Sequence, residues 1–215
     1  MPDSFSAFER RFVGPYRDGF ARLTAPLVRL LMALGVPPNL VSASQIAVGV
    51  VIIAVMGPAP QIAFILFLST LFLDSLDGAL ARTSGRGSQF GALVDQISDH
   101  TRETLVIVAV TLQGALHPGV AVLYPLVYAL FNFLLYVCNK LGAPVPWTIK
   151  SYLVVYPALF LYCFFGVPWL TPAVALSEVL MAVSIGIALR NLSRAMAAGT
   201  DGSAAATETS PPRNP

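Results

Sequence analysis

Charged residues are scarce in this chain of 215 residues. Only 11% of the residues are Asp, Glu, Lys or Arg, whereas 56% are hydrophobic. A soluble domain carries roughly 25% charged residues, so this composition excludes a water-soluble globule and indicates an integral membrane protein. The formal net charge of +2 is too small to indicate a nucleic-acid partner.

Cysteine and histidine are also rare, with two residues of each. Cys138 and Cys163 both lie in apolar runs, and His100 and His117 are far apart in the sequence. Neither a disulfide framework nor a Cys/His zinc site is therefore predicted. We expect both cysteines to pack between helices as small hydrophobic residues.

Residues 1–36 lack the uninterrupted apolar core of a signal peptide, so we expect the chain to keep its start. Large hydrophobic residues recur here every three or four positions, which predicts an amphipathic helix in the cytosolic membrane interface. Packing of this helix against the rest of the protein is the alternative. The pattern consists of Phe5, Phe8, Phe12, Tyr16, Phe20, Leu23, Leu27 and Leu30, with Arg10, Arg11, Arg17 and Arg22 between them.

Six long apolar stretches follow, each close to the ~20 residues that a helix needs to cross a bilayer. They predict an all-α fold in which residues 37–194 form a six-helix transmembrane domain. Small and turn-forming residues dominate 195–215, which predicts a disordered cytosolic tail. The six stretches are 40–57, 62–81, 90–113, 119–138, 151–166 and 173–192.

Basic residues concentrate in alternate connections between these stretches. The remaining connections contain GPAPQ, GALHPG and VPWLTP, which have no Lys or Arg. The positive-inside rule therefore places both termini and the basic connections in the cytosol, in a multi-pass protein of the cytoplasmic membrane. The basic residues are Arg82, Arg86, Lys140, Lys150, Arg190 and Arg194.

Four aspartates lie around the connection between the second and third stretches. Asp74 and Asp77 are three residues apart, and Asp95 and Asp99 are four apart, so each pair shares one helix face near the cytosolic boundary. Unpaired carboxylates at membrane depth are costly, and the neighbouring arginines could neutralise at most two of them. Oxygen ligands of this kind predict bound Mg²⁺ or Mn²⁺, as two ions about 4 Å apart.

Small residues share these helix faces. Gly78 and Ala81 continue the face of Asp74 and Asp77, and Gly91 lies one turn before Asp95. Close helix packing is the usual reason for small residues in a membrane, and it remains the alternative for each one alone. Beside four aspartates, they favour a site where a ligand approaches the backbone.

The segment 74–99 resembles the CDP-alcohol phosphatidyltransferase family. It matches the family signature D-x2-D-G-x2-A-R-x8-G-x3-D-x3-D at every fixed position, over 26 residues. The six-helix plan, the interfacial N-terminal helix and the Pro38-Asn39 step extend the resemblance beyond the motif. The fixed positions are Asp74, Asp77, Gly78, Ala81, Arg82, Gly91, Asp95 and Asp99.

This resemblance implies an enzyme that transfers the phosphatidyl group of CDP-diacylglycerol to an alcohol and releases CMP. Asp74, Asp77 and Asp95 would hold the divalent metals, and Asp99 would be a further ligand or the general base. Two of the aspartates and the small residues would also line the CDP-lipid site. The resemblance further implies a homodimer, which is usual in the family. The residues implied for the CDP-lipid site are Asp74, Asp77, Gly78, Ala81, Arg82 and Gly91.

The acceptor alcohol is less well defined by the sequence. A phosphorylated polyol such as glycerol 3-phosphate or inositol phosphate would need further cations, and serine or another small alcohol is the alternative. Arg102 is favoured because it follows Asp99 on the same helix face, although Glu103 could pair with it instead. The candidate cations are Arg102, Lys140, Lys150 and Arg190, each of which a topological role would also explain.

Two other classes of protein fit parts of the pattern. An ion-coupled transporter would also carry buried aspartates, but it predicts carboxylates near the bilayer midplane and internal repeats, and no repeat is evident. An inactive membrane scaffold would not need four intact aspartates. Glu178 in the last stretch is a further intramembrane carboxylate, expected either to function or to hydrogen-bond within the bundle or at a dimer contact.

Overall fold

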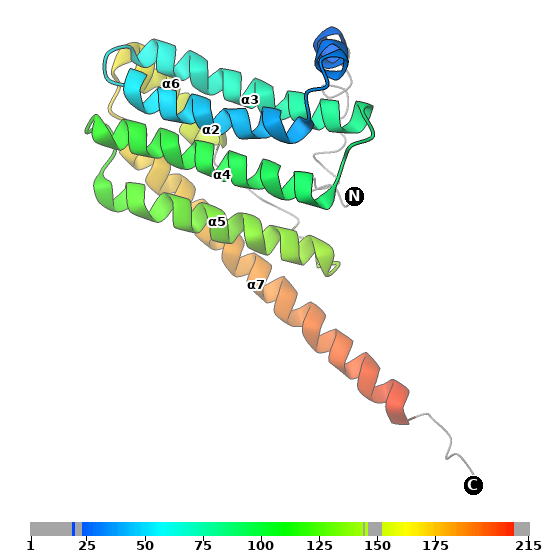
Figure 1. Cartoon of the computed structure of the whole chain (residues 1–215). Helices are drawn as coiled ribbons and strands as arrows, with labels where there is room; N and C mark the ends of the chain where they lie inside the picture. The colour runs from blue at the N-terminus through cyan, green and yellow to red at the C-terminus, as the bar shows by residue number, and fades with distance from the viewer. Residues whose placement is uncertain (1–18, 20–22, 144, 146–151, 209–215) are drawn as a thin grey trace.

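The computed structural model describes residues 19, 23–143, 145 and 152–208, with side chains up to residue 197. All regular elements in this part of the chain are helices, arranged as a bundle with one helix across its end (Figure 1). The crossing helix is Leu23–Ala33, and the bundle consists of α2 (Pro38–Val55), α3 (Pro60–Thr83), α4 (Gln89–Leu112), α5 (Pro118–Lys140), α6 (Tyr152–Phe165) and α7 (Leu170–Glu208).

Proline and serine set where the helices near the site begin. Pro38 and Pro60 are the first residues of α2 and α3, where a missing backbone N–H costs no helical hydrogen bond. Ser88 precedes α4 with an extended backbone, and its hydroxyl oxygen accepts a 2.9 Å hydrogen bond from the Gly91 backbone N–H. These local signals fix the starts of the helices that carry the signature residues.

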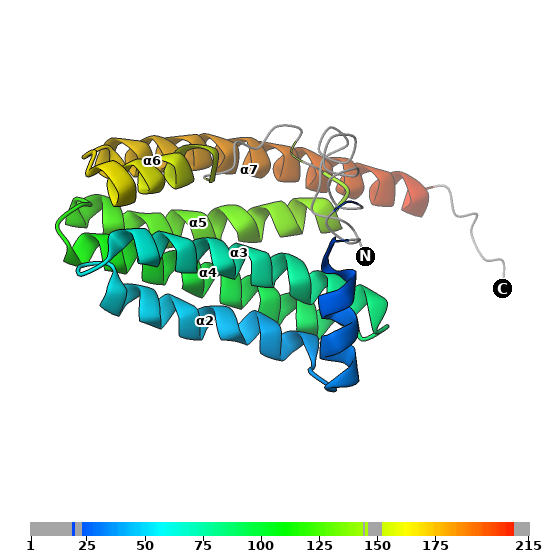
Figure 2. The same ribbon diagram turned by 90° about the horizontal axis from the view of Figure 1, so that it is seen from above.

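Helix α2 packs along both α3 and α4, whereas α3 and α4 make few contacts with each other (Figure 2). Gly49 of α2 permits the close approach of α4, because a Cβ atom there would lie 2.7 Å from Cδ1 of Leu105. On the other side, α5 contacts α4 and α7, and α6 contacts α3 and α7. The core between these helices includes Ile52, Phe67 and Val110, each at most 1% exposed.

Four helices, α2, α3, α5 and α7, are long and apolar enough to cross a membrane. Many large hydrophobic side chains point outward from them, among them Val50, Ile65, Leu126 and Val179. Over the described residues, the protein is therefore an all-helical membrane protein with four long candidate spans. The predicted count of six is not confirmed, because α4 carries four charged residues within 95–103 and α6 has only 14 residues.

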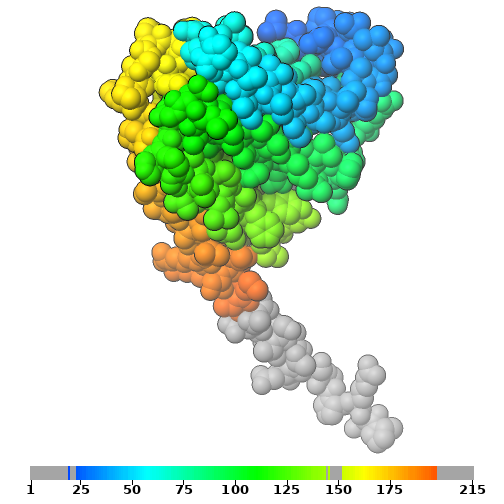
Figure 3. Space-filling model, turned by 60° about the vertical axis from the view of Figure 1, so that its left-hand side comes forward, coloured from blue at the N-terminus to red at the C-terminus, as the bar shows by residue number. Residues whose placement is uncertain are grey.

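The two predicted terminal regions overlap the described residues only in part. Residues 1–18 and 20–22 of the predicted interfacial helix lie outside the described residues, and the described helix Leu23–Ala33 packs Val28 against Leu76 and Leu80. Helix α7 continues past Arg194 to Glu208, through part of the segment predicted to be a disordered tail. Alanine has the highest helix propensity, and 195–208 is rich in it. The space-filling view shows α7 extending away from the closely packed bundle (Figure 3).

Candidate functional site

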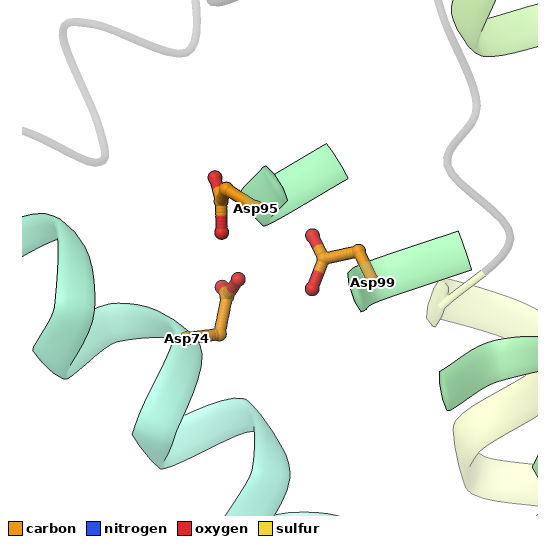
Figure 4. A group of neighbouring side chains, drawn as sticks. All are labelled: Asp74, Asp95 and Asp99. Atoms are coloured by element: carbon orange, nitrogen blue, oxygen red, sulfur yellow. The ribbon is translucent and has the colours of Figure 1, made fainter. Parts of the chain in front are cut away.

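Three of the four predicted carboxylates meet between α3 and α4. Asp74 of α3 and Asp95 and Asp99 of α4 each place one carboxylate oxygen within 4.8 Å of the other two. Figure 4 shows the three side chains pointing toward one another across the space between the two helices. We call these residues the carboxylate triad. The helical spacing of Asp95 and Asp99 gives α4 two ligands on one face, and Asp74 supplies the third from the facing helix.

The carboxylate triad fits a hard divalent cation. All its donors are carboxylate oxygens, which Mg²⁺ and Mn²⁺ prefer and which zinc in structural sites does not. All three side chains are half-buried, and Oδ1 of Asp95 is buried without a hydrogen-bond partner among the described residues. A buried carboxylate oxygen left without a donor is costly, so a coordinated metal would supply the missing partner.

Asp77, the fourth predicted carboxylate, is directed differently from the other three. It is 4% exposed, and its Oδ2 atom accepts a 2.5 Å hydrogen bond from the hydroxyl of Ser42 on α2. Asp77 therefore does not join the group of three oxygens that could share an ion. Sequence reasoning missed Ser42, because it is 35 residues from Asp77 and belongs to a different helix.

A pocket of about 160 Å³ lies beside the carboxylate triad, enclosed by α2, α3 and α4. We call it the α2–α4 pocket. It brings together all the small residues and the arginine that the signature predicts for a CDP-lipid site, with Asp77 and Asp95 at its wall. Its lining residues are Pro38, Asn39, Ser42, Asp77, Gly78, Ala81, Arg82, Arg86, Gly87, Ser88, Gly91, Ala92 and Asp95.

A larger residue at either of two glycines of this pocket would crowd a neighbouring side chain. A Cβ atom on Gly91 would lie 3.1 Å from Oδ1 of Asn39 and 3.2 Å from Oγ of Ser88. A Cβ atom on Gly78 would lie 3.2 Å from an Nη1 atom of Arg82. Both glycines line the pocket, and the exposed guanidinium groups of Arg82 and Arg86 beside them are available for anionic groups.

A second pocket, of about 250 Å³, lies between α4 and α5, and Asp99 of the carboxylate triad forms part of its wall. We call it the α4–α5 pocket. The His100 ring stacks on the Tyr128 ring at 5.6 Å between centroids, and Asn132 lies one turn further along α5. Sequence reasoning missed these residues, because α5 has no polar motif to mark them. The lining residues are Leu93, Gln96, Ile97, Asp99, His100, Thr101, Tyr128, Ala129 and Asn132.

Arg102 lies inside the bundle, away from both pockets. It is 3% exposed and forms an ion pair with Asp99, with 2.9 Å between Nη1 and Oδ1. It also donates hydrogen bonds to Oε1 of Gln45 at 2.5 Å and to Oε1 of Glu103 at 3.3 Å. The predicted pairing with Glu103 is therefore confirmed, and the described residues leave Arg102 facing protein groups on three sides.

The remaining candidates lie apart from the carboxylate triad. Lys140 is exposed at the end of α5, with its Nζ atom 5.2 Å from the centre of the Tyr136 ring, and Arg190 is exposed on α7. Neither lines the α2–α4 or α4–α5 pocket. Lys150 lies outside the described residues. Glu178 is half-buried in α7, and its Oε1 atom has no hydrogen-bond partner in the part of the chain that the structure describes.

A carboxylate triad beside a glycine-lined pocket, in a helical membrane protein, fits the class of metal-dependent phosphoryl-transfer enzymes. The family model for CDP-alcohol phosphatidyltransferase matches residues 36–190. This chain therefore belongs to the CDP-alcohol phosphatidyltransferase family. The match includes the carboxylate triad and every signature residue.

Curated relatives match a shorter part of the chain. A phosphatidylinositol phosphate synthase of Mycobacterium marinum is 34% identical over 93 residues, which are 42% of this chain and 39% of that protein. A CDP-diacylglycerol–inositol 3-phosphatidyltransferase of Candida albicans is 29% identical over 93 residues, 43% of this chain and 39% of that protein. The matches thus span about two fifths of the length of these relatives.

Solved structures share the fold over most of the chain. The phosphatidylinositol phosphate synthase of Mycobacterium tuberculosis with CDP-DAG bound has a TM-score of 0.67 at 20% identity, covering 79% of this chain and 93% of that one. The same enzyme in complex with manganese and citrate has a TM-score of 0.66 at 20% identity, covering 78% and 88%. At this identity, the likeness concerns the arrangement of the helices.

Proposed function

We propose that this protein is an enzyme that transfers the phosphatidyl group of CDP-diacylglycerol to an alcohol and releases CMP. The observation that carries this proposal is the carboxylate triad beside the α2–α4 pocket, which unites a candidate divalent-metal site with a pocket lined by arginines and glycines. Membership of the family and the relatives' names support the same reaction.

The α2–α4 pocket is the proposed site of the cytidine diphosphate group. Gly78 and Gly91 line this pocket, and Arg82 and Arg86 offer guanidinium groups to the phosphates. Asp77, held by Ser42, presents its second oxygen as an acceptor at the same wall. These groups would fix the donor so that its lipid-linked phosphorus lies beside the carboxylate triad.

The reaction forms a bond from the acceptor oxygen to this phosphorus and breaks the bond from phosphorus to CMP. Asp74, Asp95 and Asp99 would hold a divalent metal, which neutralises the pyrophosphate and stabilises charge on the departing phosphate. Asp99 belongs to the triad and also lines the α4–α5 pocket, which supports its carboxylate as the proposed acceptor of the proton from the attacking hydroxyl.

The α4–α5 pocket is the proposed entry for the acceptor, because Asp99 forms part of its wall. A phosphorylated polyol such as inositol phosphate or glycerol 3-phosphate is the proposed acceptor, with serine or another small alcohol as the alternative. Gln96, His100 and Asn132 offer hydrogen-bonding groups to hydroxyls, and the names of the relatives support an inositol compound. Lys140, Lys150 and Arg190 remain the proposed cations for its phosphate.

We further propose that α4 and α6 cross the bilayer with the four longer helices, with both termini and the carboxylate triad on the cytosolic side. In support, the basic ends of α3 and α5 lie at the same end of the bundle as the start of α2 (Figure 2). A homodimer in the cytoplasmic membrane is the proposed assembly, as is usual in the family.

The direct test uses purified protein with CDP-diacylglycerol and Mn²⁺ or Mg²⁺, offered each alcohol in turn, with CMP release as the measurement. We expect release with one phosphorylated polyol, and at least a hundredfold loss in Asp99→Asn. No CMP with any acceptor, or full activity in Asp99→Asn, would overturn the proposed mechanism.

A further inference from the structure

Behind the carboxylate triad, a chain of buried polar groups runs from α2 through α4 to α6. It begins at Gln45, which is fully buried and accepts a hydrogen bond from Arg102. Arg102 contacts Asp99 and Glu103, and Glu103 accepts a 2.5 Å hydrogen bond from the hydroxyl of Tyr156. We call Gln45, Arg102, Glu103 and Tyr156 the Arg102 network.

The Arg102 network costs stability, because each member loses solvation when it is buried. Arg102 and Glu103 are 3% and 4% exposed, and replacing such a buried ion pair by apolar residues is often neutral or stabilising. Stability alone therefore does not account for these residues at membrane depth. The network ends on Asp99, the residue that joins the metal site to the acceptor pocket.

From these contacts, we infer that Arg102 is a positioning residue for Asp99, oriented by Gln45, Glu103 and Tyr156, and does not bind the acceptor. Its guanidinium fixes one oxygen of Asp99, which orients the carboxylate toward Asp74 and Asp95. The inference rests on the proposed function for its catalytic meaning, but the contacts that support it do not depend on which alcohol is used.

The groups that orient Arg102, Gln45 directly and Tyr156 through Glu103, are themselves held by packing. The Tyr156 ring packs edge-on against Phe67, with 4.7 Å between centroids, and Phe67 is 1% exposed. Gln45 lies on α2, the helix that packs along both α3 and α4. Arg102 is therefore oriented from two other helices, α2 and α6, and a ligand held by Asp99 need not pay the entropy of ordering that side chain.

The test is the affinity of the purified protein for Mn²⁺, measured without donor or acceptor from the electron paramagnetic resonance signal of the free ion. Tyr156→Phe keeps the ring and removes only the hydroxyl, and Arg102→Lys keeps the positive charge. We expect each substitution to weaken Mn²⁺ binding by about tenfold, since groups that orient a metal ligand typically contribute this much.

The matched controls are Tyr152→Phe and Arg29→Lys. Tyr152 lies one turn before Tyr156 on α6 and is 44% exposed, and Arg29 is exposed on the crossing helix. Both variants should bind Mn²⁺ as the unchanged protein does. The thermal unfolding midpoint of every variant is measured alongside, and if Arg102→Lys does not fold, Tyr156→Phe decides.

The decisive comparison repeats Tyr156→Phe in an Asp99→Asn background. If the network acts through Asp99, the second substitution should change Mn²⁺ affinity less than about twofold. An unchanged affinity in the single variants, or an equal loss with and without Asp99, would overturn the inference. A rise in the KM for a phosphorylated acceptor without any change in Mn²⁺ affinity would instead make Arg102 an acceptor ligand.

Failure of the proposed function is a separate outcome. If no alcohol yields CMP, the Mn²⁺ measurements still show whether Arg102 positions Asp99. If CMP is released but substitutions in the Arg102 network leave Mn²⁺ affinity unchanged, the proposed enzyme function is supported and the positioning role of Arg102 is overturned.

Discussion

The hydroxyl of Ser42 donates a 2.5 Å hydrogen bond to Oδ2 of Asp77, joining α2 to α3 inside the α2–α4 pocket. Asp77 is 4% exposed, so its carboxylate depends on protein donors for solvation. This contact separates Asp77 from the three carboxylates that face one another. Asp77 thus lies at the wall of the α2–α4 pocket, the proposed donor site.

Removal of this hydroxyl should weaken use of the CDP-lipid. We expect Ser42→Ala to lower kcat/KM for CDP-diacylglycerol about tenfold, because a buried charged acceptor loses a bond worth about 1.5 kcal/mol. CMP release at varied donor concentration measures the effect. Ser44→Ala is the control, since the Ser44 hydroxyl donates its hydrogen bond to the Val41 carbonyl within its own helix. A value of kcat/KM equal to that of the unchanged protein would contradict this role for Ser42.

A methyl group on Gly91 should obstruct the donor. The Cβ atom would stand 3.1 Å from Oδ1 of Asn39, inside the pocket, so we expect Gly91→Ala to raise the KM for CDP-diacylglycerol about tenfold. Binding of Mn²⁺ without substrate should be unaffected. Gly186→Ala serves as the control, because a Cβ there meets nothing within 4 Å. If both glycine variants show the same KM, the pocket is not the donor site.

Metal removal should abolish the reaction reversibly. We expect a chelator to stop CMP release and added Mn²⁺ to restore it, and Asp95→Asn to raise the Mn²⁺ concentration for half-maximal activity at least tenfold. Glu178→Gln is the control, because Glu178 is a carboxylate of α7 outside the triad. Similar metal requirements in both variants would argue against the triad, and an altered oligomer size for Glu178→Gln would indicate a dimer contact.

Close packing of α2 on α4 should depend on Gly49. A Cβ atom there would lie 2.7 Å from Cδ1 of Leu105, so we expect Gly49→Ala to reduce stability by about 1–3 kcal/mol through overpacking. Thermal unfolding in detergent measures the loss. Adding Leu105→Ala should recover part of it by making room. If the loss of stability in the double variant equals the sum of the losses in the two single variants, the two side chains do not compete for this space.

The sequence predicted much of the site because helical spacing alone places Asp95 and Asp99 on one face. The pocket residues Gly78, Ala81 and Gly91 were likewise predicted, and the structure brings them together. What spacing cannot supply is the rotation of one helix relative to another. That rotation directs Asp77 toward Ser42 and Arg102 into the bundle. The sequence predicted neither contact, and the metal-ligand role of Asp77 stays a prediction.

The number of membrane-spanning helices is likewise difficult to predict from the sequence alone. Hydropathy predicted six spans, but α4 combines the length of a span with Asp95, Asp99, Arg102 and Glu103. Whether such a helix tolerates the bilayer depends on its neighbours, because charges that pair or bind metal no longer face lipid. Gln45 and Tyr156, which complete this pairing, come from α2 and α6 and could not be identified from the sequence of α4.

The sparse contact between α3 and α4 has a consequence for the metal-loaded protein. Both helices pack against α2 and make few contacts with each other, while their carboxylates approach one another across the space between them. A cation bound there would link α3 to α4, two helices that have little direct packing contact. Because a ligand that binds only the folded state raises its resistance to heat, the melting temperature should climb with the Mn²⁺ concentration of the buffer.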